Sequence, residues 1–288
     1  MTSKKKSQQL GTLSPFIKSV VSLIDYFSLI CALFLCGLMI CFLPVTTQIV
    51  GHTFGSWNNA QYSEEEMATI ASAARAFAFD SSDNGAYLNK TIWEVFSRYQ
   101  PQLAQSIAEH APITTVESLS SAFAYAQSTE GVSNRMLQSY LFDENAEMHL
   151  ADCTHLFDVT RILFTITFLI SLICSLILHK HQCIRRLSIV LIAGAATILV
   201  IIGVLLIWLL FDFNGLFSLF HQLFFDPNTW RFPIDSLLIS LFPMPFWSAM
   251  VGIWVAGTFL ASLLLIGLGL YFQNKLNNAT PDAVSHKK

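Results

Sequence analysis

Long apolar runs alternate with polar stretches along this chain. Four runs reach the roughly 20 largely apolar residues that a helix needs to cross a bilayer, and they cover residues 19–44, 159–178, 187–211 and 247–272. The first run is longer than the roughly 7–15 apolar residues of a signal peptide, and its exit, FLPVTTQIV, has no small-x-small cleavage site. The pattern predicts an all-α membrane protein with four transmembrane helices.

The connection between the first and second runs is long and polar. Residues 64–140 are rich in alanine, serine and glutamate, and EEEMATIASAARAFAF and TIWEVFSRYQPQLAQSIAEHA have helical spacing. Ser63 and Glu66 have the spacing of a capping box, and Asp83-Asn84-Gly85 and Pro101 punctuate the helices. We expect a small helical extracellular insert, without residues at the spacing of metal ligands or of a nucleophile.

The connection before the last run is short and aromatic. FNGLFSLFHQLFFD is too short to cross the membrane again, and its amphipathic pattern predicts a helix in the outer membrane interface. DPNTWRF is typical of a turn, and the prolines of SLLISLFPMPFW end an interfacial helix before the last run. We expect three regions: residues 1–45 with the first span, residues 46–141 as the insert, and residues 142–288 as a core with three spans.

Composition supports a membrane protein, and the distribution of charge predicts its orientation in the membrane. The chain is 53% hydrophobic and 12% charged, against about 25% charged in soluble domains. Residues 45–158 carry fourteen acidic and four basic residues, whereas lysines and arginines, which are retained on the cytoplasmic side, gather at the other ends of the runs. These are Lys4, Lys5, Lys6, Lys18, Lys180, Arg185, Arg186, Lys275, Lys287 and Lys288. We therefore expect cytoplasmic termini, with the insert and residues 212–246 outside.

The cysteines bear on one class of four-span protein. Of the six cysteines, only Cys153 is expected on the outer side, so no intramolecular disulfide can form there. This argues against the four-span junction proteins, whose outer loop is closed by a cysteine pair. Cys153 itself is expected to be a small packing residue, with a nucleophilic thiol as the alternative.

Two histidines are the candidates for chemistry. His149 shares one helical face with Asp152 and Cys153, and His221 lies on the same outer side, beyond a tight hairpin of two spans. The two imidazoles are therefore expected to meet, and a side chain with an ordinary pKa near 6.5 can take and return a proton near neutral pH. The alternative, which the pattern alone favours, is a histidine hydrogen-bonded to a carbonyl or a lipid phosphate.

Other polar residues give weaker signals. A zinc site needs three protein ligands, and the sequence contains neither HExxH nor CxxC, so we expect no metal. His155 is expected on the far side of the His149 helix, packed or solvated. Trp230 and Arg231 are expected at headgroup depth, where the arginine snorkels or, alternatively, binds a lipid phosphate.

The stretches EMHLADCTHLFD and FHQLFFDPNTWRFPIDSLLISLFPMPFW resemble the four-span family of lipoprotein intramolecular transacylases, Lit, of low-GC Gram-positive bacteria. That family shows a His-hydrophobic-x-Asp motif before its second span. Before its fourth span it shows His-x-x-hydrophobic-Phe, Asn-x-Trp and Pro-x-x-Phe. The insert at residues 64–140 departs from the family pattern, which leaves the substrate range open.

The resemblance implies an acyltransferase of the bacterial cell membrane. In this reaction the sn-2 chain of a lipoprotein's diacylglyceryl-cysteine moves to the α-amino group of the same cysteine and leaves a lyso-form lipoprotein. The family's two essential histidines correspond to His149 and His221, and Asp152, Trp230 and Arg231 would bind substrate or support the site. The implied partners are the diacylated lipoprotein and membrane lipid, without a cofactor or nucleic acid. The extracellular insert is a separate candidate for binding an unidentified partner.

Elementary chemistry agrees with this implication. The substrate supplies its own nucleophile, an amine with an ordinary pKa near 7.7–8.0. One histidine as base and one as acid or oxyanion donor are then sufficient. Phe217, Phe220, Phe224 and Phe225 would exclude water or anchor the segment in the membrane, and the insert is expected to be dispensable for chemistry. The alternatives are a lipid acyltransferase or lipase that uses the same histidines, and a non-catalytic membrane sensor or assembly protein.

Overall fold

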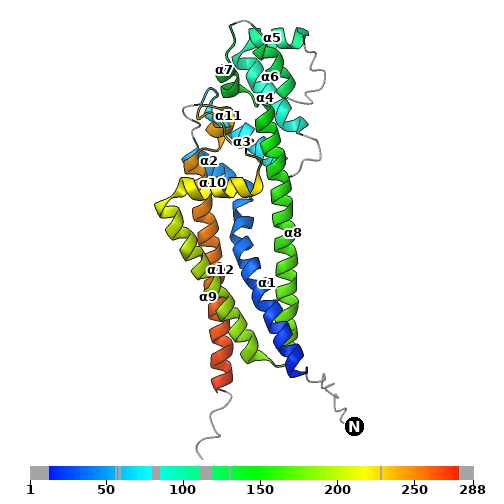
Figure 1. Ribbon diagram of the computed structural model, residues 1–288, viewed down its shortest axis with the longest axis vertical. Helices are drawn as coiled ribbons and strands as arrows, with labels where there is room; N and C mark the ends of the chain where they lie inside the picture. Colours follow the sequence, from blue (N-terminus) through cyan, green and yellow to red (C-terminus); the bar gives the residue numbers. More distant parts are fainter. Residues whose placement is uncertain are drawn as a thin grey trace, which may run out of the picture. The chain divides into compact units, whose positions relative to one another are not determined.

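The computed structural model describes residues 13–55, 57, 60–79, 85–110, 119–129, 131–227 and 229–278. These residues form helices joined by turns, and no strand occurs among them (Figure 1). The helices are α1 (Pro15–Cys41), α2 (Pro44–Phe54), α3 (Glu64–Phe79), α4 (Ala86–Tyr99), α5 (Pro101–His110), α6 (Leu119–Gln127), α7 (Asn134–Tyr140), α8 (Glu144–Lys180), α9 (Ile184–Phe211), α10 (Phe213–Phe224), α11 (Leu237–Leu241) and α12 (Met244–Asn278). The predicted all-α class is confirmed.

Four of these helices, α1, α8, α9 and α12, are long and apolar enough to cross a membrane. They coincide with the four predicted runs, and their bounds differ for local reasons. The first helix ends at Cys41, before the predicted end of the run, because Pro44 starts a separate helix as its first residue. Helix α8 begins at Glu144, well before the apolar run, because the carboxylate of Asp143 caps it by accepting a 2.9 Å hydrogen bond from the amide of Ala146.

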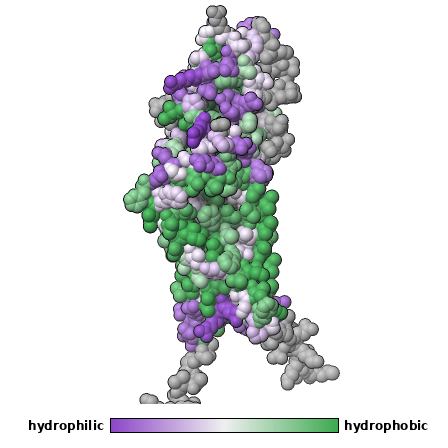
Figure 2. Space-filling model, viewed as in Figure 1, coloured by the Kyte–Doolittle hydropathy of each residue, from purple (hydrophilic) through white to green (hydrophobic). Residues whose placement is uncertain are grey.

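The chain forms two compact units, and the first contains residues Met1–Gly37, Ile162–Leu206 and Ala256–Lys288. Figure 2 shows that the surface of the long helices in this unit is mainly hydrophobic. Val200 and Leu264, for example, are 67% and 76% exposed. Such a surface is stable in lipid but not in water.

The interior of the first unit contains buried polar side chains. Asp25 is 0% exposed, and its two carboxylate oxygens accept hydrogen bonds from Ser171, at 2.7 Å, and Ser175, at 2.8 Å. One residue further along α1, the hydroxyls of Tyr26 and Thr197 lie 2.9 Å apart. In lipid, packing and hydrogen bonds between helices replace the hydrophobic drive that operates in water. These contacts therefore set how α1 pairs with α8 and α9.

The second unit contains residues Leu38–Arg161 and Ile207–Val255. Its main hydrophobic core is built jointly by the insert helices, the start of α8 and α11, and we call this cluster the shared core. Its fully buried members include Met67, Ile70, Ile92, Phe96, Ile107, Leu119, Leu137, Leu141, Phe142 and Leu241. The insert therefore has no separate core of its own.

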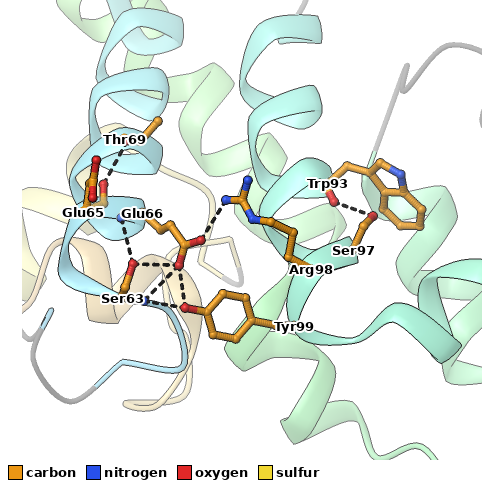
Figure 3. Close-up of polar contacts among 8 residues, drawn as sticks. All are labelled: Ser63, Glu65, Glu66, Thr69, Trp93, Ser97, Arg98 and Tyr99. Atoms are coloured by element: carbon orange, nitrogen blue, oxygen red, sulfur yellow. Dashed lines mark hydrogen bonds and ion pairs between the residues drawn. The ribbon is translucent and has the colours of Figure 1, made fainter.

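The predicted capping box at the start of α3 is present (Figure 3). The amide of Ser63 donates to Glu66 Oε2 at 3.1 Å, and the amide of Glu66 donates back to Ser63 Oγ at 3.4 Å. The same carboxylate accepts hydrogen bonds from Tyr99, at 2.6 Å, and Arg98, at 2.8 Å. Burial raises the pKa of Glu66, but these hydrogen bonds outweigh it and hold the pKa below its ordinary value. The box thus joins α3 to the end of α4.

The segment between α9 and α12 also follows the prediction. Asp212 caps α10 by accepting a 2.8 Å hydrogen bond from the amide of Gly215. The predicted turn after α10 closes with hydrogen bonds from the amide and the hydroxyl of Thr229 to the carbonyl of Asp226, at 3.2 and 3.1 Å. Asn228, which belongs to the Asn-x-Trp motif, lies outside the described residues. Helix α11 then ends at Leu241, before Pro243.

Candidate active site

His149 lies on the first turns of α8. Hydrogen bonds from α6 to the neighbouring Glu147 and a contact with Phe225 fix its position. Glu147, two residues earlier, accepts hydrogen bonds from the amides of Leu119, at 2.7 Å, and Ser120, at 3.3 Å. A carboxylate there satisfies amides at the start of α6 and complements its dipole. The imidazole of His149 packs against Phe225, with ring centres 4.7 Å apart.

His221 is the one buried side chain of α10, at 8% exposure. Its Nδ1 lies 2.8 Å from the carbonyl oxygen of Phe217, one turn earlier. Because a carbonyl only accepts hydrogen bonds, Nδ1 must carry the proton. In the neutral ring, Nε2 therefore holds the lone pair that can accept another proton.

The structure brings the two histidines together within the second unit. Their ring centres are 5.9 Å apart and their planes are inclined by 22°. Aromatic side chains surround them: Phe217 and Trp230 contact His221 at 4.0 and 4.9 Å, and Phe225 contacts both rings. We call His149, His221 and these aromatic neighbours the histidine cluster.

The surroundings keep both imidazoles neutral. Burial lowers the pKa of His221 below its ordinary value of 6.5. His149 precedes the apolar run of α8, and burial, followed by the neighbouring His221, lowers its pKa to about 4. A neutral imidazole is the form that accepts a proton, so both rings are in the form that a general base requires at neutral pH.

Cys153 lies one turn after His149, with its Sγ 3.8 Å from His149 Nε2. Burial, and then the charge of Asp152, raise the pKa of this thiol to about 12. It therefore remains protonated, as expected for a packing residue rather than a nucleophile. Asp152 and His155 are both exposed, so neither lies inside the histidine cluster.

Trp230 belongs to the cluster, and Arg231 contacts Trp230. The indole ring lies 4.9 Å from the His221 ring, and the guanidinium of the exposed Arg231 lies over the same indole, 4.9 Å from its centre. Such a contact is a cation–π interaction.

One member of the surroundings was missed at the sequence level, and one expected member lies elsewhere. The ring of Phe232 lies 5.7 Å from His149 and also packs against the shared core. Phe232 could have been expected near the site because it lies in the same turn as Trp230, two residues further along the chain. Phe224, one of the four phenylalanines expected to exclude water or to anchor the segment, is 53% exposed and packs against Phe220, with ring centres 5.0 Å apart and planes inclined by 51°.

Two buried polar atoms of the cluster have no hydrogen-bond partner in the described part of the chain. Among the described residues five side-chain atoms are of this kind, and His149 Nδ1 and Trp230 Nε1 are two of them. Such an atom costs about 1–3 kcal/mol, which marks a place where a bound molecule would restore the missing hydrogen bond. Within the described ranges, no group of three or more His, Cys, Asp or Glu side chains is placed to hold a metal ion.

Together, the fold and the cluster define a multi-pass α-helical membrane protein with two neutral, adjoining histidines outside its apolar runs. The family model of the lipoprotein intramolecular transacylases, Lit, matches residues 98–247, which is just over half of the 288 residues. The chain belongs to this family and is therefore an acyltransferase. The matched range includes both histidines and Trp230.

Comparison with curated protein sequences gives no match. Among similar solved structures are three of the membrane integral lipoprotein intramolecular transacylase Lit from Bacillus cereus. One, with a histidine replaced by arginine, is 14% identical over 92% of this chain and 95% of that chain, with a TM-score of 0.48. Another is 15% identical over 91% and 98%, with a TM-score of 0.45. A variant with histidine replaced by alanine is 15% identical over 91% and 96%, with a TM-score of 0.48.

Proposed function

We propose that this protein transfers the sn-2 acyl chain of a lipoprotein's S-diacylglyceryl-cysteine to the α-amino group of the same cysteine. The product is a lyso-form lipoprotein with an N-acylated cysteine. The observation that carries the proposal is the hydrogen bond from His221 Nδ1 to the carbonyl of Phe217, with His149 stacked nearby. It gives the family's reaction a neutral base beside a second neutral imidazole.

In the first step the substrate amine attacks the sn-2 ester carbonyl. The amine has an ordinary pKa near 7.7–8.0 and is nucleophilic only when it is deprotonated. His221 Nε2 accepts the proton that the nitrogen loses as the new carbon–nitrogen bond forms. The carbonyl carbon becomes tetrahedral, and its oxygen becomes an oxyanion.

In the second step the tetrahedral adduct collapses. The carbon–oxygen bond to the glycerol C2 oxygen breaks, and that oxygen must gain a proton to leave as a hydroxyl. The proton that His221 accepted passes to His149, whose Nδ1 is free of protein partners within the described part of the chain, and from His149 to the glycerol oxygen, so both rings return to their starting state. The proton balance closes, because the amine loses one proton and the glycerol oxygen gains one.

The proposal needs no covalent enzyme intermediate. The amine and the ester belong to one molecule, and well-oriented intramolecular reactions reach effective molarities of roughly 10⁵–10⁸ M. The protonated thiol of Cys153 is a poor nucleophile, so its place beside His149 is one of packing. The phenylalanines around His221 exclude the water that would otherwise hydrolyse the ester.

The site is proposed to lie on the outer side of the cell membrane, with both termini in the cytoplasm. The support is the distribution of charge: basic residues flank one set of helix ends, and the insert is acidic. Diacylated lipoproteins are anchored in lipid, so the substrate would enter from the membrane.

A reporter lipoprotein tests the proposed function. It would be expressed in a host that forms diacylated lipoproteins, with and without this protein, and its N-terminal peptide analysed by tandem mass spectrometry. We expect an unchanged total mass with one acyl chain moved from the glyceryl group to the amine. Loss of one acyl mass would instead identify a lipase, and an unmodified diacyl peptide would favour a non-catalytic protein.

A further inference from the structure

We propose that the indole N–H of Trp230 is the oxyanion donor of the acyl transfer. This inference rests on the proposed function and names the group that stabilises the charge on the attacked carbonyl. It assigns to Trp230 direct contact with a reacting atom, in place of a general supporting role.

The first argument is the hydrogen-bonding state of the indole. Nε1 of Trp230 is buried and has no acceptor among the described residues. An indole nitrogen only donates, so the missing partner must be an acceptor. Another buried indole in the same unit has its acceptor: Nε1 of Trp57 donates a hydrogen bond to the carbonyl of Leu241 at 3.2 Å. The indole N–H that lacks an acceptor therefore belongs to Trp230, the tryptophan that contacts His221.

The second argument is position. The indole of Trp230 packs on the His221 ring at 4.9 Å, with the planes inclined by 35°. The substrate amine transfers its proton to His221 while it attacks the ester carbonyl. The carbonyl must therefore lie close to the His221 ring. An N–H group held by the same contact is within reach of the carbonyl oxygen, where the negative charge develops.

The third argument concerns donor strength. The guanidinium of Arg231 lies 4.9 Å from the centre of the indole ring. A cation over the π face draws electron density from the ring, which makes its N–H a stronger donor to an anion. Arg231 is thereby a positioning and polarising residue, which acts through Trp230 and does not touch the substrate.

The assignment also completes the division of roles within the cluster. His221 accepts the amine proton at Nε2, and His149 carries a proton to the leaving glycerol oxygen. Trp230 loses no proton: its hydrogen bond strengthens as the carbonyl becomes an oxyanion and weakens when the carbonyl re-forms. No oxidant, metal or further reactant enters the step.

The test replaces Trp230 in the full-length protein with 3-benzothienyl-alanine, in which sulfur stands for the N–H and the bicyclic shape is kept. Loss of one oxyanion donor lowers kcat by about 10²–10³-fold in other acyl-transfer enzymes, and we expect a loss of that size. KM and the unfolding temperature should change little. Trp57 with the same replacement is the matched control, because its N–H holds Leu241: it should lose stability while the folded fraction keeps its kcat.

A sulfur-substituted substrate separates catalysis from packing. If the sn-2 ester carbonyl is replaced by a thionoester, the developing charge sits on sulfur, a weak hydrogen-bond acceptor. The parent enzyme should then lose more rate on this change than the Trp230 analogue does. Equal sensitivity, or a kcat of the analogue close to that of the parent, overturns the inference while leaving the proposed function intact. A parent protein that yields no N-acyl product overturns both.

Discussion

At the scale of single residues, the two histidines are held differently. His221 is fixed in one tautomer by the Phe217 carbonyl, whereas His149 has only the weak partner Cys153 on one ring nitrogen and none on the other within the described residues. The first arrangement suits a base that must present one lone pair. The second suits a group that must exchange its proton between two positions.

This difference leads to a prediction for activity. His149→Ala and His221→Ala should each lower kcat/KM by at least about 10²-fold, and the double variant should be little worse than either single one, because the residues act as a unit. Lyso-lipoprotein formation at equal protein levels measures the effect. His155→Ala, at the exposed site nearby, is the control. Normal activity in both single variants would disprove the assignment of the site.

For Cys153, in contrast to the histidines, we predict that substitution leaves the activity largely unchanged. Cys153→Ala should retain activity within a few-fold, because the substrate amine attacks the ester directly and the thiol remains protonated. Intact-protein mass spectrometry of the parent, quenched during turnover, should show no added acyl mass. A trapped acyl-enzyme in the parent, together with an inactive Cys153→Ala variant, would establish a two-step covalent mechanism instead.

The buried histidines also predict how stability depends on pH. Both folded pKa values lie below 6.5, so below pH 6.5 the folded protein binds fewer protons than the unfolded chain. Their neutral forms leave stability intact above pH 6.5, and stability is lost as the pH falls toward about 4, the pKa of His149. The loss from His149 should be on the order of 3 kcal/mol near pH 4.

Thermal unfolding of the purified protein at pH 7.5 and pH 5 measures this dependence. The double variant His149→Phe with His221→Phe should be less sensitive to acid than the parent, whereas His155→Phe should behave like the parent because His155 is exposed. An equal acid sensitivity in the double variant would show that other groups cause it.

Sequence reasoning reaches some of these residues and not others. The meeting of His149 and His221 was predictable because a tight hairpin of two spans returns the chain to the same side. The tautomer of His221 was not, because its partner is a backbone carbonyl that any residue at position 217 would supply. Asp25 had a signal that was not used: it is the one acidic residue within the four predicted apolar runs.

At the scale of elements, the insert and α11 stabilise each other. Leu237, Leu238 and Leu241 of α11 belong to the shared core together with residues from α3 to α7, and the exposed pair Arg135–Asp235, at 2.5 Å, adds an ionic link between α7 and the segment before α11. Phe232 packs on this core and on His149. The insert therefore supports the histidine cluster through the shared core and Phe232.

This packing changes what removal of the insert is expected to do. A linker in place of residues 64–140 would leave the α11 leucines and Phe142 exposed, so the protein should fail to accumulate in the membrane. The finer test is Leu137→Ala, at a fully buried position of the core, which should cost about 2–5 kcal/mol. Arg135→Gln, which breaks only a solvent-exposed ion pair, should change stability far less, because water and salt screen such a pair. Thermal unfolding followed by residual activity measures both, and similar values for the two variants would contradict the shared core.

The insert helices were predictable as helices from their spacing and from the Ser63 capping box, because both signals are local. The packing of these helices against α11 in the shared core was not predictable. The two parts are separated in the sequence by two spanning helices, and complementary apolar faces give no pairing signal in a single sequence. The three regions drawn from the sequence, 1–45, 46–141 and 142–288, remain a proposal about organisation.

At the scale of the whole molecule, the four spans and the charge pattern predict an orientation. A reporter that is active only in the cytoplasm, fused after the C-terminal residue Lys288, should be active, and the same reporter placed in the insert should be silent. An export-dependent reporter should give the reverse result. Activity of the export-dependent reporter at the C-terminus would invert the proposed topology and place the histidines in the cytoplasm.

The shared core also has a consequence for the order in which the protein is made. Ribosomes synthesise the insert long before α11, and α8 and α9 must enter the bilayer between the two events. Until the connection after α9 arrives, the nascent insert presents an apolar face that nothing in its own chain can cover, which is the state that chaperones and membrane proteases recognise. The last short helix to be translated before α12 therefore acts as a checkpoint for biogenesis, because its arrival closes the core and positions the turn with Trp230 at the same moment.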